Sequence, residues 1–270
     1  MTSEPPKPAR NMIVRDIADI RVDIDRVDTA FLSLIAERLE LAAAVRRAKS
    51  GARVWRPSRE DSHVRDLARA ATDASPLLVS RIWAELMSAS LALQGPMRLH
   101  VALEGDAIDV STLVRDRFGA ALPVLSYPTA SSALAAAYAE EEGVAILPTP
   151  GGMNSWWTAL CDGGAMPDMH VLAGLPRVID TEILSATSAS GWPRAVAVAT
   201  ADIAPSGADD SLLIVGKNIV PDEGQMLGEA GEKCLYRIAR YIDPDSAYFQ
   251  ALKARDPQAK LIGCLPHPLS

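Results

Sequence analysis

The chain has 270 residues, 49% apolar and 23% charged, an ordinary globular composition with enough length for one or two domains. Its net charge of −7 and pI of about 5.2 provide no basic field for nucleic acid or anionic lipid, so any bound anion must meet a local cluster of cations. Three sparse cysteines, a polar proline-rich start and the lack of a run of about 20 apolar residues favour a soluble, cytoplasmic protein outside the membrane.

Helical periodicity extends over residues 12–49 without a proline or glycine. Apolar residues such as Ile17, Ile24 and Phe31 recur one heptad apart along this segment. A helix of about 38 residues far exceeds the mean length of about 11 and cannot bury its apolar stripe alone. The sequence therefore predicts a long helix that packs against partner helices or a second chain.

Two shorter helices are predicted next, over residues 59–71 and 76–94, and Asp73 or Ser75 can cap the second. From residue 98 strand-like and helix-like segments alternate, which is typical of an α/β unit. The last two predicted elements are a helix near residues 225–241 and a strand over residues 259–266. The expected fold class is a helical domain, residues 1–97, followed by an α/β region, residues 98–270.

Cationic side chains interrupt the apolar stripe of the long helix. Arg38 lies within the stripe, and Lys49 points within about 20° of it, roughly 16 Å further along the axis. Arg21 lies about 100° around the axis from Arg38, so these two arginines cannot easily serve one site on the same helix face.

Polar residues also mark the two shorter helices. Arg59 and Glu60 open the first of them, and Ser90 and Gln94 share one face of the second. Together with Arg38 these residues provide several cations and neutral donors with one carboxylate, the set of groups expected in a pocket for a small polyanion. The alternative is that each charge is solvated, because long arginine side chains often lie along apolar surface with their heads in water.

The segments "IRVDIDRVDTAFLSLIAERLELAAAVRRAK", "RE" and "RIWAELMSASLALQ" resemble the all-helical chorismate mutase family over about residues 12–96. The ordered series of Arg, Arg, Lys, Arg-Glu, Ser and Gln is more specific than any one match. In that family two chains intertwine, their long first helices pack antiparallel, and each active site mixes residues of both chains. The resemblance therefore implies an intertwined homodimeric bundle that binds chorismate, with Arg21 reaching in from the partner chain.

The resemblance also implies an activity, the isomerisation of chorismate to prephenate in the shikimate pathway of aromatic amino acid biosynthesis. This internal [3,3] shift needs no nucleophile, metal or cofactor, only a held conformer and stabilised charge. The implied substrate-binding residues are Arg21, Arg38, Arg59 and Ser90, while Lys49 and Gln94 would donate to the ether oxygen and Glu60 would accept from the ring hydroxyl.

One position departs from the family pattern. Arg56 stands where the family commonly has an aspartate near the substrate's hydroxyl end, which can weaken or alter recognition. Two alternatives therefore stay open: an isochorismate pyruvate lyase of the same fold, and a non-catalytic ligand-binding or regulatory protein.

The second half loosely resembles a degenerate prephenate dehydratase, with one lobe over about residues 98–205 and a remnant of its regulatory domain over about 206–270. "HVALEGD", "PTASSALAAAYAEEEGVAILPTPGG" and "WPRAVAVA" carry this resemblance. Pro193 stands where that family has its active threonine, and residues 150–152 replace its Glu-Asn-Ser turn. We therefore expect no dehydratase activity. The histidines and cysteines lack metal-ligand spacing, and the adjacent Trp156 and Trp157 are interpreted as core.

Overall fold

The computed structural model describes residues 16–48, 54–179 and 192–270. The first elements that the structure describes are three helices, α1 (Ile17–Ala48), α2 (Pro57–Ala70) and α3 (Pro76–Gln94). All three predicted helices are confirmed, and α2 begins two residues early because proline fits the first helical turn, where the missing N–H costs nothing. Ser75 caps α3 by accepting from the backbone N–H of Leu78 at 3.2 Å. Both α1 and α2 pack against α3.

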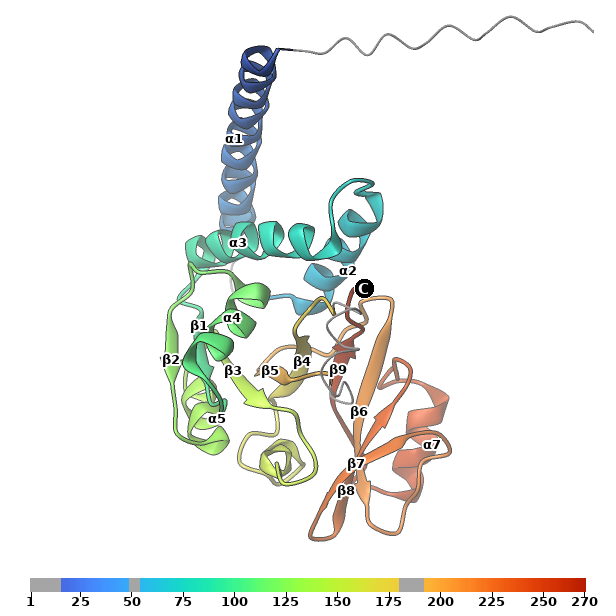
Figure 1. The fold of residues 1–270 in the computed structure, drawn as a ribbon. Helices are drawn as coiled ribbons and strands as arrows, with labels where there is room; N and C mark the ends of the chain where they lie inside the picture. Colours follow the sequence, from blue (N-terminus) through green and yellow to red (C-terminus); the bar gives the residue numbers. More distant parts are fainter. Residues whose placement is uncertain (1–15, 49–53, 180–191) are drawn as a thin grey trace, which may run out of the picture.

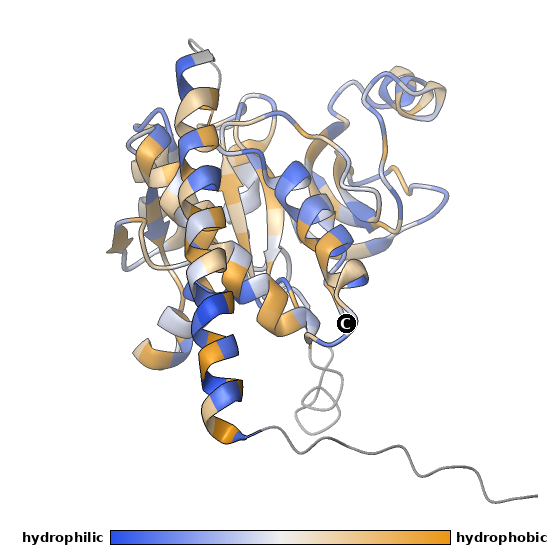
Figure 2. Ribbon diagram, turned by 90° about the horizontal axis from the view of Figure 1, so that it is seen from above, coloured by the Kyte–Doolittle hydropathy of each residue, from blue (hydrophilic) through white to orange (hydrophobic). Residues whose placement is uncertain are grey.

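Much of α1 projects away from the remainder of the molecule (Figure 1). Apolar side chains along it stay in solvent, with Ile17 65% and Leu34 61% exposed, and Ile24 and Phe31 exposed as well. Figure 2 shows orange, hydrophobic bands recurring along this helix. Within the described part of this single chain, no other element covers the apolar stripe over the first half of α1, whereas the second half of the helix packs against α3.

The second region is built on one mixed nine-stranded sheet with the order β2-β1-β3-β5-β4-β9-β6-β8-β7. β1 pairs in parallel with β2 and β3, and β4 pairs in parallel with β9, whereas the other neighbours are antiparallel. The strands on both sides of residue 205 belong to this sheet, so the expected boundary there does not separate two sheets. The strands are β1 (Arg98–Val101), β2 (Val124–Ser126), β3 (Gly143–Pro148), β4 (His170–Leu175), β5 (Ala195–Ala199), β6 (Asp209–Gly216), β7 (Gln225–Ala230), β8 (Lys233–Ile238) and β9 (Lys260–Pro266).

Helices cover both faces of this sheet (Figure 1). Alternate residues of β3 face opposite ways, so Ile146 packs in one core with Phe118 of α4 and Leu147 packs in another with Trp157. Trp156 and Trp157 are both buried, which confirms their interpretation as core residues. Among the residues that the structure describes, the helices of this region are α4 (Ala107–Phe118), α5 (Ala130–Tyr138), the 3-10 helix η1 (Trp156–Leu160) and α7 (Ala247–Arg255).

The predicted helix near residues 225–241 is wrong, because this segment forms the antiparallel hairpin of β7 and β8. The turn between the strands contains Gly231 with φ of +59°, a conformation that glycine adopts without steric cost. A helix does form later, at α7, where the Ser246 side chain accepts from the backbone N–H of Phe249.

The apolar helix α3 has the length and composition needed to cross a membrane, in contrast to the expectation that no such run exists. It packs against α1, α2 and α4, and 33% of its most apolar stretch is buried. Its apolar character is thus partly explained by its place between the helical region and the sheet region.

Candidate functional site

A pocket of about 320 Å³ lies where α1, α2 and α3 meet. It brings together five of the seven residues predicted from the sequence. Apolar groups, including Leu41 and Val45 of α1 and Met87 of α3, form part of its wall. The predicted residues that line it are Arg38, Arg59, Glu60, Ser90 and Gln94, and Arg56 and His63 lie beside them.

Arg38 is held in place by α3. Its Nη1 donates to the Ser90 hydroxyl at 2.9 Å and to the Leu86 carbonyl at 3.0 Å, and the same hydroxyl donates to that carbonyl at 2.7 Å. Partial burial lowers the pKa of Arg38 and the nearby Glu60 raises it, but a guanidinium with so high an ordinary pKa stays charged at neutral pH. Ser90 therefore orients a cation at the pocket wall.

Glu60 lies in the first turn of α2, where the helix dipole favours a carboxylate. Its side chain is only 14% exposed, and one oxygen lies 3.2 Å from Arg117 Nη1 and 3.6 Å from Arg177 Nη2. Burial is the largest influence and raises the pKa of Glu60 to about 7, although Arg117 opposes the rise. Glu60 can therefore change its charge near neutral pH.

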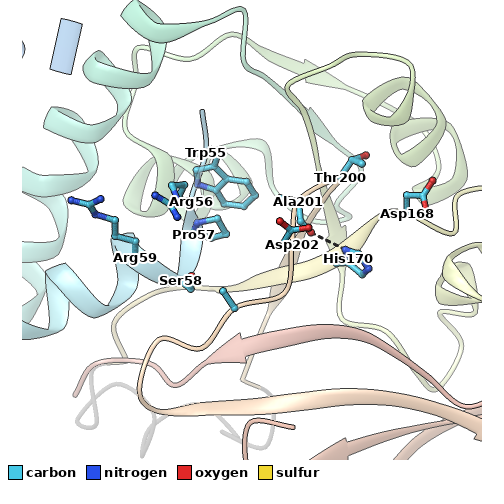
Figure 3. Close-up of a pocket in the computed structure, with 11 residues that line it drawn as sticks. Trp55, Arg56, Pro57, Ser58, Arg59, Asp168, His170, Thr200, Ala201 and Asp202 are labelled. Carbon is cyan, nitrogen blue, oxygen red and sulfur yellow. Dashed lines mark hydrogen bonds between the residues drawn. The ribbon is translucent and has the colours of Figure 1, made fainter. Parts of the chain in front are cut away.

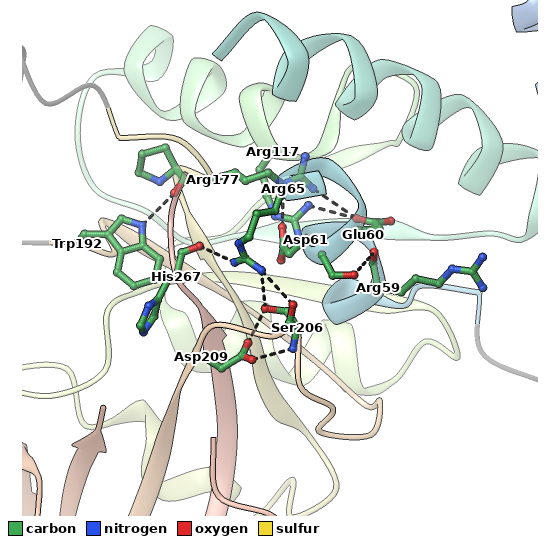
Figure 4. Close-up of polar contacts among 12 residues, drawn as sticks. Arg59, Glu60, Asp61, Arg65, Arg117, Arg177, Trp192, Ser206, Asp209 and His267 are labelled. Carbon is green, nitrogen blue, oxygen red and sulfur yellow. Dashed lines mark hydrogen bonds and ion pairs between the residues drawn. The ribbon is translucent and has the colours of Figure 1, made fainter. Parts of the chain in front are cut away.

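A buried cluster of charges behind Glu60 was not predicted from the sequence (Figure 4). Asp61 accepts from Arg117 Nη2 at 3.0 Å and from Arg177 Nε at 2.8 Å. Both arginines come from the sheet region, Arg117 from α4 and Arg177 from the loop after β4, and both are buried. The adjacent acidic pair of residues 60 and 61 was the only signal in the sequence, and it does not reveal which distant arginines would neutralise it.

A second anchor joins α2 to the sheet region, at the segments just before β6 and just after β9. The buried Arg65 donates through Nη1 to the backbone carbonyl and hydroxyl of Ser206, and through Nη2 to the carbonyl of His267 (Figure 4). The face of α2 that carries Asp61 and Arg65 is thus fixed to the sheet region, while Arg59, Glu60 and His63 line the pocket.

Two predicted residues are not brought to the pocket of this chain. Arg21 lies on the exposed part of α1, about 26 Å along the helix axis from Arg38, and does not line the cavity. Lys49 lies outside the described residues.

A larger cavity, of about 780 Å³, lies on the other side of the segment that leads into α2 (Figure 3). Arg56 and Arg59 line both cavities, and Figure 3 shows Arg59 extending away from Asp202 and His170. The remaining walls of the larger cavity are Trp55, Pro57 and Ser58 on one side and Asp168, His170, Thr200, Ala201, Asp202 and Ala204 on the other.

No cluster of three or more His, Cys, Asp or Glu side chains suited to a metal ion occurs among the residues that the structure describes. His170 Nδ1 instead lies 2.8 Å from the Ala201 carbonyl, and burial lowers the pKa of this histidine. The cysteines Cys161, Cys234 and Cys264 are free and buried.

Comparison with known families shows that residues 20–95 match the family of chorismate mutase type II. The matched segment contains every residue predicted for the site, and it ends before β1. The expected resemblance of residues 98–270 to a dehydratase and its regulatory domain finds no support in the comparisons. Among curated proteins, none matches the chain.

One similar solved structure is described as "GqqA- a novel type of quorum quenching acylases". The similarity covers 64% of this chain and 96% of that chain, with 13% sequence identity and a TM-score of 0.43. A likeness at this level supports no assignment of activity to this chain.

Proposed function

We propose that the protein is a chorismate mutase that converts chorismate to prephenate by an internal rearrangement. The observation that carries this proposal is the pocket that gathers Arg38, Arg59, Glu60, Ser90 and Gln94 within the segment matching type II chorismate mutases. Cations and neutral donors surround one carboxylate there, which suits a small dicarboxylate with a single hydroxyl.

In this proposal the cations hold the substrate in its compact reactive conformer. Guanidinium groups bind carboxylates through two parallel hydrogen bonds, so Arg38, with Arg59 assisting, would clamp one carboxylate and Arg21 of the partner subunit the other. Ser90 would support the carboxylate at Arg38, consistent with its 2.9 Å contact to that guanidinium. Holding the substrate in this one conformer lowers the activation barrier, because the entropy cost of ordering the substrate has already been met on binding.

The remaining residues act on charge that changes during the reaction. The ether oxygen becomes more negative as its carbon–oxygen bond breaks, so Gln94 and Lys49 would stabilise the transition state by donating to it. Glu60 in its ionised form would accept a hydrogen bond from the ring hydroxyl. No proton transfer is required of any of these residues.

The test is conversion by the full-length protein. Chorismate absorbance should fall while prephenate accumulates, and no pyruvate should appear. Pyruvate release from isochorismate would instead identify the lyase alternative. Failure to consume either compound would reject the catalytic proposal and leave the ligand-binding alternative.

We also propose that two chains pair through α1 and share their sites. The exposed apolar stripe of α1 supports this, because a 32-residue helix has little to stabilise it when such a stripe faces water. In an antiparallel pair with its two-fold axis midway between Arg21 and Arg38, near Thr29 and Ala30, each Arg21 lies opposite the partner's Arg38. This arrangement would bring the missing cation to each pocket.

Mixing two inactive variants tests the shared site. Chains carrying Arg21→Ala and chains carrying Arg38→Ala should each be nearly inactive alone. After unfolding and refolding together, random pairing should restore about a quarter of the wild-type activity, because each mixed dimer regains one intact site. Co-refolding of Arg38→Ala with itself is the control, and no recovery in the mixture would contradict sites shared between chains.

The activity should depend on the charge of Glu60. Because burial raises the pKa of Glu60 to about 7, its acidic form predominates below that pH and cannot accept a hydrogen bond as a carboxylate does. We expect kcat/KM to rise with pH through a midpoint near 7 and then level off. Glu60→Gln should remove this limb of the profile, and a wild-type profile that is flat from about pH 5.5 to about 8.5 would contradict the role of Glu60.

A second candidate function for the sheet region, the binding of a small regulatory ligand, is favoured by the larger cavity. That cavity shares Arg56 and Arg59 with the smaller pocket, so an occupant would contact residues of both. Phenylalanine and tyrosine are the probes, and a change in mutase rate that Asp202→Ala abolishes would support this role.

We propose no dehydratase activity, since Pro193 provides no hydroxyl.

A further inference from the structure

The carboxylate proposed to contact the substrate's hydroxyl is held from outside the helical region. Glu60 belongs to α2, but the cations nearest to it are Arg117 of α4, at 3.2 Å, and Arg177 of the loop after β4, at 3.6 Å. In Figure 4 dashed lines join Arg117 to Glu60. Glu60 lines the pocket of the helical region, but the arginines that pair with it come from the sheet region.

Arg117 is itself fixed in one orientation. Its side chain is fully buried, and its two terminal nitrogens are divided between two carboxylates, Nη1 to Glu60 and Nη2 to Asp61 at 3.0 Å. Arg177 repeats the arrangement with Nε on Asp61. Two buried cations thus neutralise two adjacent buried carboxylates, an arrangement that restricts the rotamers of all four side chains.

We propose that Arg117 and Arg177 are positioning residues for the mutase reaction, which hold the Glu60 carboxylate at the pocket wall as an acceptor for the substrate's hydroxyl. This inference rests on the proposed function. It gives the sheet region a part in catalysis without any reaction chemistry of its own, because neither arginine lines the pocket.

The physical basis is the balance between burial and pairing. Burial alone disfavours the ionised form of Glu60, and Arg117 is the largest influence that favours it. Without Arg117, the neighbouring Asp61 would repel a charge on Glu60 with less compensation. Four groups act on the pKa of Glu60 besides its burial: Arg117 from α4, Asp61 from α2, Trp55 from the segment before α2, and Arg38 from α1. Arg177 lies 3.6 Å away, and the other polar groups of the described residues that line the pocket are Arg56, Arg59, His63, Ser90 and Gln94.

The experiment compares pH profiles of kcat/KM for the full-length wild type, Arg117→Met and Arg117→Lys. Arg117→Met should move the acid midpoint upward by about one pH unit or more, since one opposite charge at this distance shifts a carboxyl by about 1–3 units. Arg117→Lys retains the charge and should restore much of the shift. A midpoint unchanged in Arg117→Met, with activity merely reduced by the same factor at every pH, would overturn the proposal.

Arg81→Met is the matched control. Arg81 also bridges the two regions, through hydrogen bonds of 2.8 and 3.0 Å to Asp116 of α4, but it does not contact Glu60. Its loss should leave the midpoint at the wild-type value. If Arg117→Met does not fold, Arg177→Met serves instead, because Arg117 still pairs both carboxylates; it should give a smaller upward shift, and no shift overturns the proposal.

A direct titration separates this inference from the proposed function. If the wild type does not turn over chorismate, the mutase proposal fails, but the carbon-13 signal of the Glu60 carboxyl can still be followed, with Glu60→Gln used for its assignment. Its pKa should be higher in Arg117→Met than in the wild type. Equal values in the two proteins would reject the positioning of Glu60 by Arg117.

Discussion

Replacing Arg38 by alanine should lower kcat/KM for chorismate by about a hundredfold to a thousandfold, the loss that follows removal of one well-placed charged donor. The size of the effect follows from how this side chain is held. Nη1 is fixed on Ser90 and Leu86, whereas the other edge of the guanidinium makes no hydrogen bond with any residue that the structure describes, so a substrate carboxylate can bind there. The measurement is steady-state kinetics at about pH 8, where Glu60 is ionised.

Arg46→Ala is the matched control for Arg38→Ala. Arg46 also belongs to α1 and also donates through Nη1 to a carbonyl of α3, that of Leu93, but it does not line the pocket. Its replacement should change kcat/KM by less than about twofold, as is usual for an exposed contact. Equal losses in the two variants would show that Arg38 acts on helix packing rather than on substrate.

Replacing Asp61 by alanine should produce the largest loss of stability, about 3–5 kcal/mol in the free energy of unfolding, because it leaves buried Arg117 and Arg177 with one carboxylate between them. An uncompensated buried cation costs far more than the pair itself contributes. Urea unfolding of the full chain at constant pH measures the effect. The further change Arg177→Met should recover part of the loss, because it removes the excess charge.

Asp116→Ala provides the comparison at the surface. Asp116 pairs with Arg81, whose side chain is half exposed, and breaking such a pair costs about 0–1 kcal/mol. Similar losses for Asp61→Ala and Asp116→Ala would mean that water reaches the buried cluster and that its charges are not desolvated.

The helical region was predictable because its information is local. A heptad pattern without glycine or proline defines α1, and Pro57, Ser75 and Pro76 mark where α2 and α3 begin. The hairpin of β7 and β8 was mistaken for a helix because its apolar residues also recur at helical spacing. Gly231, which permits the turn, was the signal against that interpretation.

The candidate site likewise has one part that the sequence could predict and one part that it could not. The pocket residues could be named from one stretch of sequence, because the ordered series of polar residues on three consecutive helices resembles the chorismate mutase family. The pairing of Glu60 and Asp61 with Arg117 and Arg177 depends on how α4 and β4 dock against α2, and no local pattern in the sequence encodes that docking. The contribution of Arg21 depends on a second chain and remains a proposal.

The buried cluster of Glu60, Asp61, Arg117 and Arg177 limits how the helical region can be separated from the sheet region. A fragment that ends at residue 97 would retain Glu60 and Asp61 but lose both of their cationic partners, together with the carbonyls that anchor Arg65. The two halves are therefore not interchangeable modules. If the helical half were fused to a different domain, that domain would need to supply cations that neutralise Glu60 and Asp61. We therefore expect the helical half and the sheet half to be inherited together.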